Sequence, residues 1–399
     1  MNTSDTDPEL IVGGGTINEK KRQFLADADA DDSTATKHPN RNKGDSSSSF
    51  DPSVHKAHLF HALEGLERYP NYLQRWNEED LDLLEQALEE KLQQVRQQRK
   101  SVVERRSYMS TIVSRLVESD ERFQQLANPP TSWDYIRDHV LDERASKAIF
   151  RSRMFRRMPA SSAPSVQDIL SGSVAMELDA EYLEDIMEQE MFDVYSFPLL
   201  RKEFCDRIQN YIRAVMDLLE QDKDSGNIYR GSTKDLDRLG LSWINDLLFH
   251  LILRPITRHL YQETEAKDEL DWRQGYIAAY AAIPSTTRPR ERLVPHTDDS
   301  EVTLNVNIGD IFEGGDLEMR GLRDAKDAGS LYGVYTPQVG RALIHAGRHL
   351  HEVTPITKGE RFAYIIWARS WSGCRSITCP CCWLNRRDGK SCSCGARWN

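Results

Sequence analysis

The stretch that decides the fold of this chain is PHTDDSEVTLNVNI, residues 295–308. Apolar and polar residues alternate along its second half, with the period of a β-strand. The apolar residues at 302, 304 and 306 would share one face of that strand, and the polar residues at 303, 305 and 307 would share the other. A strand with one polar face either lines a polar cavity or lies at the edge of a sheet, and the residues alone leave both interpretations open.

Two candidate metal ligands open this stretch. His296 and Asp298 are two residues apart, so both side chains can project to the same side as a strand ends. This pair is a weak motif alone, and most of the specificity comes from GRALIHAGRHLHEVTPITKGERFAYIIW, residues 340–367. That stretch holds three histidines, His345, His349 and His351. We assign the third ligand to His351, because it precedes a Thr-Pro turn and lies ten residues before Arg361.

These residue types indicate a particular metal chemistry. Two imidazoles and one carboxylate on one face of a metal leave the opposite positions open, which is typical of non-haem Fe(II) oxygenases. The open positions can then hold a co-substrate and dioxygen. Arg361 is planar and always charged, so it suits the far carboxylate of a bidentate 2-oxo acid. The sequence therefore predicts an iron site in which His296, Asp298 and His351 are the catalytic ligands.

Other polar residues of the downstream stretch are less specific. We interpret His345 and His349 as structural residues or as neighbours of the ligands, with a contact to substrate as the alternative. Arg341 and Arg348 could also bind a carboxylate, but surface charges are the simpler interpretation.

The rest of the second half predicts the architecture around these residues. A short strand is expected at Phe192–Phe197, followed by a helix with an apolar face from Leu200 to Leu219 and by another from Ser242 to Ile252, ending before Pro255. The period then changes to that of strands, which are expected at 276–282, 302–306, 316–319, 341–345 and 361–367. Many short strands after supporting helices predict an α+β fold with a jelly-roll core, also called a double-stranded β-helix.

The first part of the chain has a different composition. Residues 1–57 are poor in large apolar residues and are expected to be a disordered tail, and residues 58–178 are expected to form a mostly α-helical region. A long helix over 78–117 carries Leu81, Leu88 and Val95 at helical spacing, and it either contacts a partner as a coiled coil or packs back onto the same chain. Residues 144–157 mix basic and aromatic residues, which fits either nucleic acid or acidic protein tails as partners, or a solvated helix face.

Composition limits the class of protein. The chain has 399 residues, and its 52 basic and 63 acidic residues give 52 − 63 = −11 as the net charge. An acidic chain argues against a protein that coats duplex nucleic acid. No apolar stretch approaches the length of a membrane span or of a secretory leader. We therefore expect an intracellular protein, in the cytoplasm or the nucleus, with no membrane partner.

Six cysteines gather at the C-terminal end, residues 373–399, among basic residues. In a reducing compartment such a cluster suggests a metal site more readily than disulfides. Zn(II) held by Cys379, Cys382, Cys392 and Cys394 is one expectation, and a reduced, flexible tail is the other. The basic residues of this tail could assist docking of a substrate.

The run HTDDSEVTLNVNIGDIFEGGDLEMRG followed by GRALIHAGRHLH resembles the prolyl 4-hydroxylase-like branch of the Fe(II)/2-oxoglutarate dioxygenases. Within it the run is similar to the intracellular 2-oxoglutarate- and iron-dependent oxygenase domain-containing proteins of animals and to the plant incurvata-type proteins. The resemblance covers roughly 192–371 and implies a dioxygenase domain over 179–372, with the β-helix core at about 273–372. It implies that Arg361 pairs with 2-oxoglutarate and that Tyr280 helps to hold it.

The expected function follows from this resemblance. It is a dioxygenase that hydroxylates a macromolecule, with a protein favoured over nucleic acid, and releases succinate and CO2. Its cofactors would be Fe(II), 2-oxoglutarate and dioxygen, with ascorbate as a candidate reductant. One alternative is an oxidative N-demethylase of histones or nucleic acids, although Arg361 and Arg369 are eight residues apart, where AlkB-like demethylases have two arginines six apart. Another is a regulatory scaffold with a vestigial barrel.

Overall fold

The structure is a computed structural model that describes residues 78–156, 164–176, 184–221, 233–261, 270–285, 290–309, 311–322 and 329–370, together with 179, 182, 287 and 288. All of them belong to one compact unit, residues 49–399. The expected tail at 1–57 and the cysteine-rich end at 373–399 lie outside the described residues, so these domain boundaries stay predictions. None of the described helices has both the length and the apolar character that a membrane crossing requires.

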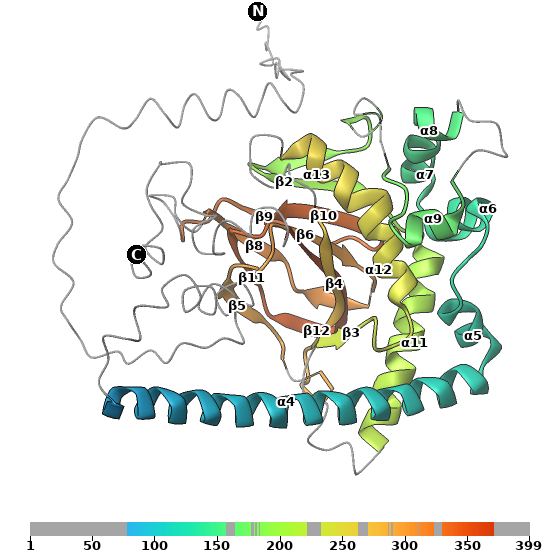
Figure 1. Cartoon of the computed structure of the whole chain (residues 1–399). Helices are drawn as coiled ribbons and strands as arrows, with labels where there is room; N and C mark the ends of the chain where they lie inside the picture. Colours follow the sequence, from blue (N-terminus) through green and yellow to red (C-terminus); the bar gives the residue numbers. More distant parts are fainter. Residues whose placement is uncertain are drawn as a thin grey trace, which may run out of the picture. The chain divides into compact units, whose positions relative to one another are not determined.

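Two antiparallel sheets form the centre of the described part, in a mixed arrangement of helices and strands (Figure 1). The major sheet has the order β1-β2-β10-β6-β12-β4-β3, with β7 paired to β12, and the minor sheet has the order β5-β11-β8-β9. The bounds are β1 Glu188–Met191, β2 Val194–Pro198, β3 Thr233–Asp235, β4 Trp272–Ala281, β5 Leu293–His296, β6 Val302–Asn307, β7 Phe312–Gly314, β8 Leu317–Leu322, β9 Gly333–Tyr335, β10 Arg341–Ala346, β11 His349–Val353 and β12 Ile356–Arg369.

The expected strands all have counterparts in these sheets. β4, β6, β8, β10 and β12 lie at the predicted places, and β12 is longer than predicted because it pairs with β4 along ten residues and with β6 and β7 as well. The strand expected from Phe192 begins at Val194 instead. Asp193 adopts a left-handed conformation (φ 56°) in the turn between β1 and β2, and this turn separates the two strands.

The helices that pack beside the major sheet are α11 Lys202–Gln221, α12 Ser242–Leu248, the π-helical η3 Phe249–Leu253 and α13 Arg254–Leu260, with the short α9 Val166–Leu170 against α12 and η3. The prediction that the helix ends before Pro255 is wrong. The helix passes through η3 into α13, and Pro255 lies in the first turn of α13. The wider π-turn lets the chain continue past a residue that has no N–H to donate.

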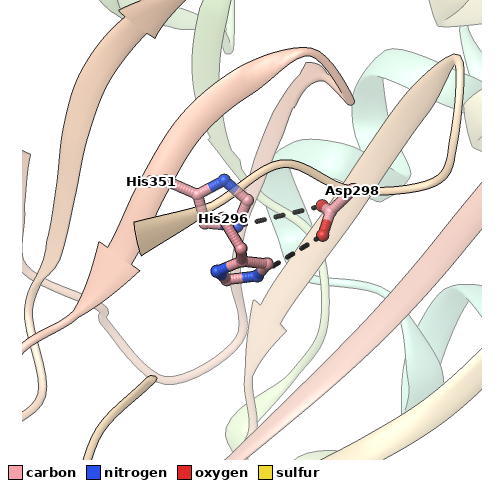
Figure 2. A group of neighbouring side chains, drawn as sticks. All are labelled: His296, Asp298 and His351. Carbon is pink, nitrogen blue, oxygen red and sulfur yellow. Dashed lines mark ion pairs between the residues drawn. The ribbon is translucent and has the colours of Figure 1, made fainter. Parts of the chain in front are cut away.

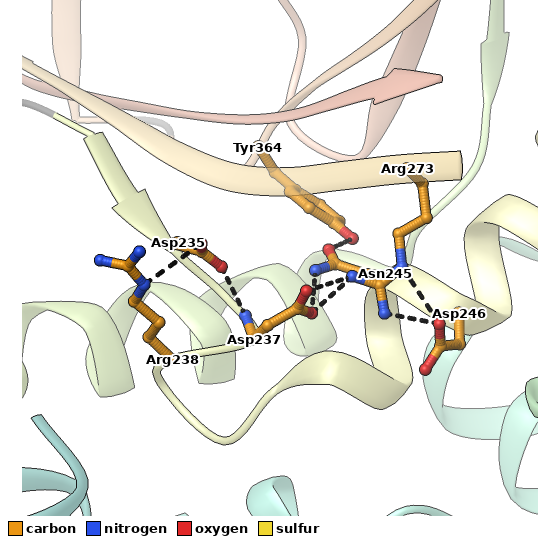
Figure 3. Close-up of polar contacts among 7 residues, drawn as sticks. All are labelled: Asp235, Asp237, Arg238, Asn245, Asp246, Arg273 and Tyr364. Atoms are coloured by element: carbon orange, nitrogen blue, oxygen red, sulfur yellow. Dashed lines mark hydrogen bonds and ion pairs between the residues drawn. The ribbon is translucent and has the colours of Figure 1, made fainter. Parts of the chain in front are cut away.

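A hydrogen-bonded network fastens α12 to the back of the major sheet (Figure 3). The buried Asn245 donates to Asp237 Oδ1 (2.8 Å) and accepts from the Tyr364 hydroxyl of β12 (2.7 Å). Arg273 of β4 donates to Asp237 Oδ1 (2.6 Å) and, through Nε, to Asp246 Oδ1 (3.1 Å). Residue 275 has to be glycine here, because a Cβ would lie 1.8 Å from Asn245 Oδ1.

The described N-terminal region is helical, as expected: α4 Glu78–Ser119, α5 Glu121–Ala127, α6 Trp133–Tyr135, η1 Ile136–Val140, α7 Glu143–Phe150 and α8 Arg153–Arg156. The C-terminal part of α4 packs against α5 and α11, so packing onto the same chain is confirmed for that part. Trp243 Nε1 of α12 donates to the Leu126 carbonyl (2.8 Å) and joins this region to the rest.

The described part of the basic and aromatic stretch, residues 144–156, contains α7 and α8. Its aromatic rings contact one another and Trp133: the ring centroids of Phe150 and Phe155 are 4.7 Å apart, and those of Trp133 and Phe155 are 5.1 Å apart. Rings engaged in this way are not presented for base stacking, which favours the structural interpretation over nucleic-acid binding.

Candidate metal and co-substrate site

The strand pairing brings the three candidate ligands together. His296 ends β5, and His351 lies directly opposite it in β11. Asp298 follows two residues later, where its backbone N–H donates to the Gly347 carbonyl (2.9 Å). One side-chain donor atom from each of the three residues lies within 4.8 Å of the others (Figure 2). His296 Nε2 is 3.6 Å from Asp298 Oδ1, and His351 Nε2 is 3.9 Å from Asp298 Oδ2.

Backbone carbonyls fix how the two imidazoles face the carboxylate. Nδ1 of His296 lies 2.9 Å from the Val294 carbonyl, and Nδ1 of His351 lies 2.9 Å from the His349 carbonyl. A carbonyl only accepts, so each Nδ1 carries the proton and the lone pair lies on Nε2, toward Asp298. Burial lowers the pKa of both histidines, which favours the neutral form that binds metals.

The polar face of β6 supports the third ligand. The Thr303 hydroxyl donates to Asp298 Oδ2 (2.6 Å) and is itself 2.8 Å from the Ser300 hydroxyl. β6 is hydrogen-bonded to β10 on one side and to β12 on the other. The edge-strand interpretation is therefore wrong, and the polar residues of β6 face the interior.

The two remaining histidines are buried beside the three ligands. His345 Nε2 is 3.9 Å from Asp298 Oδ2, and the ring centroids of His345 and His351 are 4.9 Å apart. His349 is 1% exposed, and neither of its ring nitrogens has a hydrogen-bond partner among the described residues. Burial lowers the pKa of His349 to about 3, so it is neutral. Both histidines therefore lie next to the candidate ligands.

Arg361 is the most unusual charged residue of the described part. It is 0% exposed and lies on β12 opposite Tyr280 of β4, with its guanidinium carbon 5.6 Å from the centre of that ring. None of its three guanidinium nitrogens has a hydrogen-bond partner among the described residues. Burial lowers the pKa of Arg361. A buried charge without a partner is costly, so this side chain is arranged for an anion.

Two nearby arginines have partners. The expectation that Arg341 and Arg348 are surface charges is wrong, because the Arg341 side chain is only 12% exposed and that of Arg348, in the turn between β10 and β11, is 8% exposed. Arg341 Nη2 lies 2.7 Å from Glu188 Oε2, and Arg348 Nη2 lies 3.4 Å from Asp193 Oδ2. Both carboxylates come from β1 and the turn after it, which are far away in the sequence.

Tyr335 of β9 also lies in this neighbourhood, although no pattern in the sequence indicated it. Its buried hydroxyl lies beside Arg341 and makes no close hydrogen bond with the described residues. Burial raises the pKa of Tyr335 to about 12, and the charges of Arg341 and Arg361 oppose that rise. Gly315 closes the pocket on another side, since a Cβ there would lie 3.2 Å from Arg361 Cδ and 2.4 Å from Ile356 Cδ1.

The candidate zinc ligands Cys379, Cys382, Cys392 and Cys394 lie outside the described residues. Zinc binding by the tail therefore stays a prediction.

No family model matches the chain. Among curated proteins, it is 31% identical over 208 residues to the 2-oxoglutarate and iron-dependent oxygenase domain-containing protein CP2 of Arabidopsis thaliana, covering 48% of this chain and 49% of that protein. It is 27% identical over 293 residues to the human 2-oxoglutarate and iron-dependent oxygenase domain-containing protein 2, covering 70% and 81%. A rat multifunctional procollagen lysine hydroxylase and glycosyltransferase, LH3, is 29% identical over 196 residues, covering 46% and 24%. The chain spans about half the length of the plant relatives it matches.

Solved structures with a similarity include a prolyl 4-hydroxylase of Phytophthora capsici (TM-score 0.33, 15% identity, 45% of this chain and 60% of that chain). Another is a prolyl hydroxylase of Trichoplax adhaerens in complex with a hypoxia inducible factor peptide fragment (TM-score 0.29, 17% identity, 43% and 78%). The curated relatives confirm the resemblance to the 2-oxoglutarate and iron-dependent oxygenase domain-containing proteins that the residues had indicated.

Proposed function

We propose that this relative of the 2-oxoglutarate and iron-dependent oxygenase domain-containing proteins is an Fe(II)- and 2-oxoglutarate-dependent dioxygenase that hydroxylates a protein and releases succinate and CO2. One observation carries the proposal: a group of two histidines and one aspartate within 4.8 Å lies in the same interior as a fully buried arginine with no partner among the described residues. We interpret the two antiparallel sheets as the two halves of a jelly-roll, with the site between them.

His296, Asp298 and His351 would hold the iron. When bound, the metal supplies the activation of dioxygen. The protein supplies the geometry: the carbonyls of residues 294 and 349 orient the imidazoles, and Thr303 holds one oxygen of Asp298. Because the donors face one another from two strands and a loop, a single ion can contact all three.

Arg361 would pair with the far carboxylate of 2-oxoglutarate. Its planar guanidinium offers two parallel N–H donors, and an incoming carboxylate would neutralise the charge that the protein leaves without a partner. Tyr280, against the guanidinium, and Tyr335, whose hydroxyl makes no close hydrogen bond with the described residues, are positioned to assist. Arg361 is fully buried, so its contact with a carboxylate would be stronger than in water.

A protein substrate is favoured over nucleic acid. The chain is acidic, and relatives carry the names of procollagen lysine hydroxylases. The AlkB-like nucleic-acid demethylases carry a second arginine after the distal histidine, but Arg369 of this chain is engaged elsewhere: its Nη2 lies 2.6 Å from Asp299 Oδ2, and its guanidinium carbon is 4.5 Å from the Trp272 ring.

The proposal is tested with the full-length protein. Purified protein with Fe(II), 2-oxoglutarate and dioxygen should produce succinate, and Asp298→Ala should not. The scaffold alternative predicts no turnover in either protein. A proteomic comparison of cells with active protein and cells with Asp298→Ala then separates the two reactions, because hydroxylation adds 16 mass units to the target and demethylation removes 14.

A further inference from the structure

The long helix α4 has two halves with different surroundings. Near its C-terminal end, Met109, Ile112 and Leu116 are 2%, 4% and 5% exposed, because they pack against the rest of the protein. Toward the N-terminus the apolar side chains are open instead: Leu81, Leu88, Leu92, Val95 and Val103 are 37%, 51%, 41%, 60% and 59% exposed. We call these five residues the exposed stripe. Figure 1 shows α4 meeting α5 and α11 only toward its C-terminal end, in agreement with the packing.

The five residues of the exposed stripe share one face of the helix, which also carries Glu85 and Arg99. At 3.6 residues per turn, its five positions fall within about 80° of the helix circumference and span about 33 Å along the axis. The face that packs onto the protein is centred about 100° away from it by the same geometry. The stripe is therefore no extension of the packed face, and a narrow apolar stripe of this length is typical of a coiled-coil seam.

The charges along α4 are strongly divided between its two ends. Residues 78–90 contain acidic residues at 78, 79, 80, 82, 85, 89 and 90 and no basic residue. Residues 91–106 contain basic residues at 91, 96, 99, 100, 105 and 106 and one acidic residue, Glu104. Two ion pairs within this part of α4, Arg96 with Glu89 (3.4 Å) and Lys100 with Glu104 (4.0 Å), are exposed, and such pairs contribute little.

We propose that the exposed stripe is the seam of an antiparallel coiled coil between two copies of this chain. An antiparallel pair that crosses near Leu92 places the acidic half of each helix beside the basic half of the other. It also places Leu88 of one copy beside Val95 of the second, and Leu81 beside Val103. A parallel pair would put like charges side by side, which disfavours it.

This arrangement makes the dimer independent of the candidate metal site. None of the candidate ligands lies on α4, and the part of α4 that packs onto the protein begins beyond the stripe. Loss of the dimer should therefore leave 2-oxoglutarate turnover unchanged, and the inference does not rest on the proposed function.

The test measures the mass of the full-length protein by sedimentation velocity over a range of concentrations. Wild-type protein should be a dimer. Leu92→Lys places a charge in the seam and should weaken the dimer by roughly 100-fold or more, because each dimer loses two buried leucines at about 1.5–3 kcal/mol each. Gln97→Lys, on the opposite face of the same helix, is the matched control and should leave the dimer intact. Circular dichroism confirms that both variants keep the helix.

Charge reversal tests the orientation. One variant carries Asp82→Lys, Glu85→Lys and Glu89→Lys, and the other carries Arg96→Glu, Arg99→Glu and Lys100→Glu. Each alone should be monomeric at a concentration at which wild type is a dimer, because antiparallel pairing then brings like charges together. Their equimolar mixture should form a heterodimer. A monomeric wild-type protein at about 100 μM, or dimers that persist in both separate variants, would overturn the proposal and leave the stripe to another segment of the chain or to a different protein.

Discussion

Two arginines, the partly buried Arg273 and the fully buried Arg361, lie on the paired strands β4 and β12, and they differ in what surrounds them. Arg273 donates to Asp237 and Asp246 in the network behind the major sheet (Figure 3). Arg361 has no hydrogen-bond partner for any guanidinium nitrogen among the described residues. Arg273 is paired with carboxylates, as a structural arginine is. The guanidinium of Arg361 keeps its N–H donors for an anionic ligand.

The pKa values of the two arginines shift in opposite directions, in agreement with their surroundings. Burial works against the charge of Arg273, but its bonds with Asp246 and Asp237 outweigh that effect, and its pKa is raised. Burial lowers the pKa of Arg361, and the more distant Tyr280, Tyr335 and Asp316 offset it only in part. A protein that keeps such a charge without a close counterion loses stability, and an incoming carboxylate would restore it.

The largest effect is expected at the metal ligands. His296→Ala, Asp298→Ala and His351→Ala should each abolish 2-oxoglutarate turnover, because a metal held by two remaining donors loses its geometry. His349→Ala is the control, since His349 does not belong to the group of three candidate ligands, and it should retain at least part of the activity. Succinate formation measures the activity of the three ligand variants and of the control. Activity that survives in His351→Ala and vanishes in His349→Ala would show that the third ligand is assigned wrongly.

The contrast between the arginines should also be visible in stability. Arg273→Met should lower the free energy of unfolding by about 2–3 kcal/mol, somewhat less than for a fully buried pair because Asp237 stays partly exposed. Arg361→Met should leave it unchanged or raise it, because it removes a charge that has no partner. Urea unfolding without iron or 2-oxoglutarate measures both variants. An equal loss of stability in Arg273→Met and Arg361→Met would mean that Arg361 is a structural residue.

A smaller effect is expected when the charge of Arg361 is kept. Arg361→Lys loses the two-pronged geometry, so affinity for 2-oxoglutarate should weaken roughly 10- to 100-fold, about 1.4 to 2.7 kcal/mol. Arg341→Lys should matter much less, because Arg341 is bound to Glu188. The dependence of turnover on 2-oxoglutarate concentration measures this affinity. An unchanged dependence in Arg361→Lys would exclude Arg361 from the site.

A single hydroxyl should contribute least to binding. Tyr335→Phe should weaken 2-oxoglutarate binding about 2- to 12-fold, the net effect of one hydrogen bond of about 0.5–1.5 kcal/mol. Tyr364→Phe is the matched change in the structural network, where it removes the bond to Asn245. It should lower stability and leave affinity unchanged, and equal affinity in Tyr335→Phe and wild type would remove Tyr335 from the proposal.

The cysteine tail should have no effect on the core reaction. If Cys379, Cys382, Cys392 and Cys394 hold zinc, the full-length protein should contain about one equivalent besides the iron. Truncation after Ser372 should remove it and leave 2-oxoglutarate turnover intact, because the proposed ligands all precede the cut. Elemental analysis decides this, and freshly reduced protein without zinc would reject the metal site.

Much of this site could be predicted from the sequence because its chemistry is local. His296 and Asp298 are close in the sequence, and His351 and Arg361 flank one turn. Partners that come from distant strands could not be predicted: the burial of Arg348 depends on Asp193, and the position of Tyr335 depends on a strand of three residues. The passage of the helix through Pro255 also required the structure, because a π-turn leaves no pattern in the sequence.

The most direct test of the central claim is calorimetric titration of 2-oxoglutarate into Fe(II)-loaded protein without oxygen. The account predicts one molecule bound per chain in wild type, no detectable binding in Arg361→Met, and wild-type affinity in Arg273→Met that has remained folded. Binding of equal strength in wild type and Arg361→Met would contradict it.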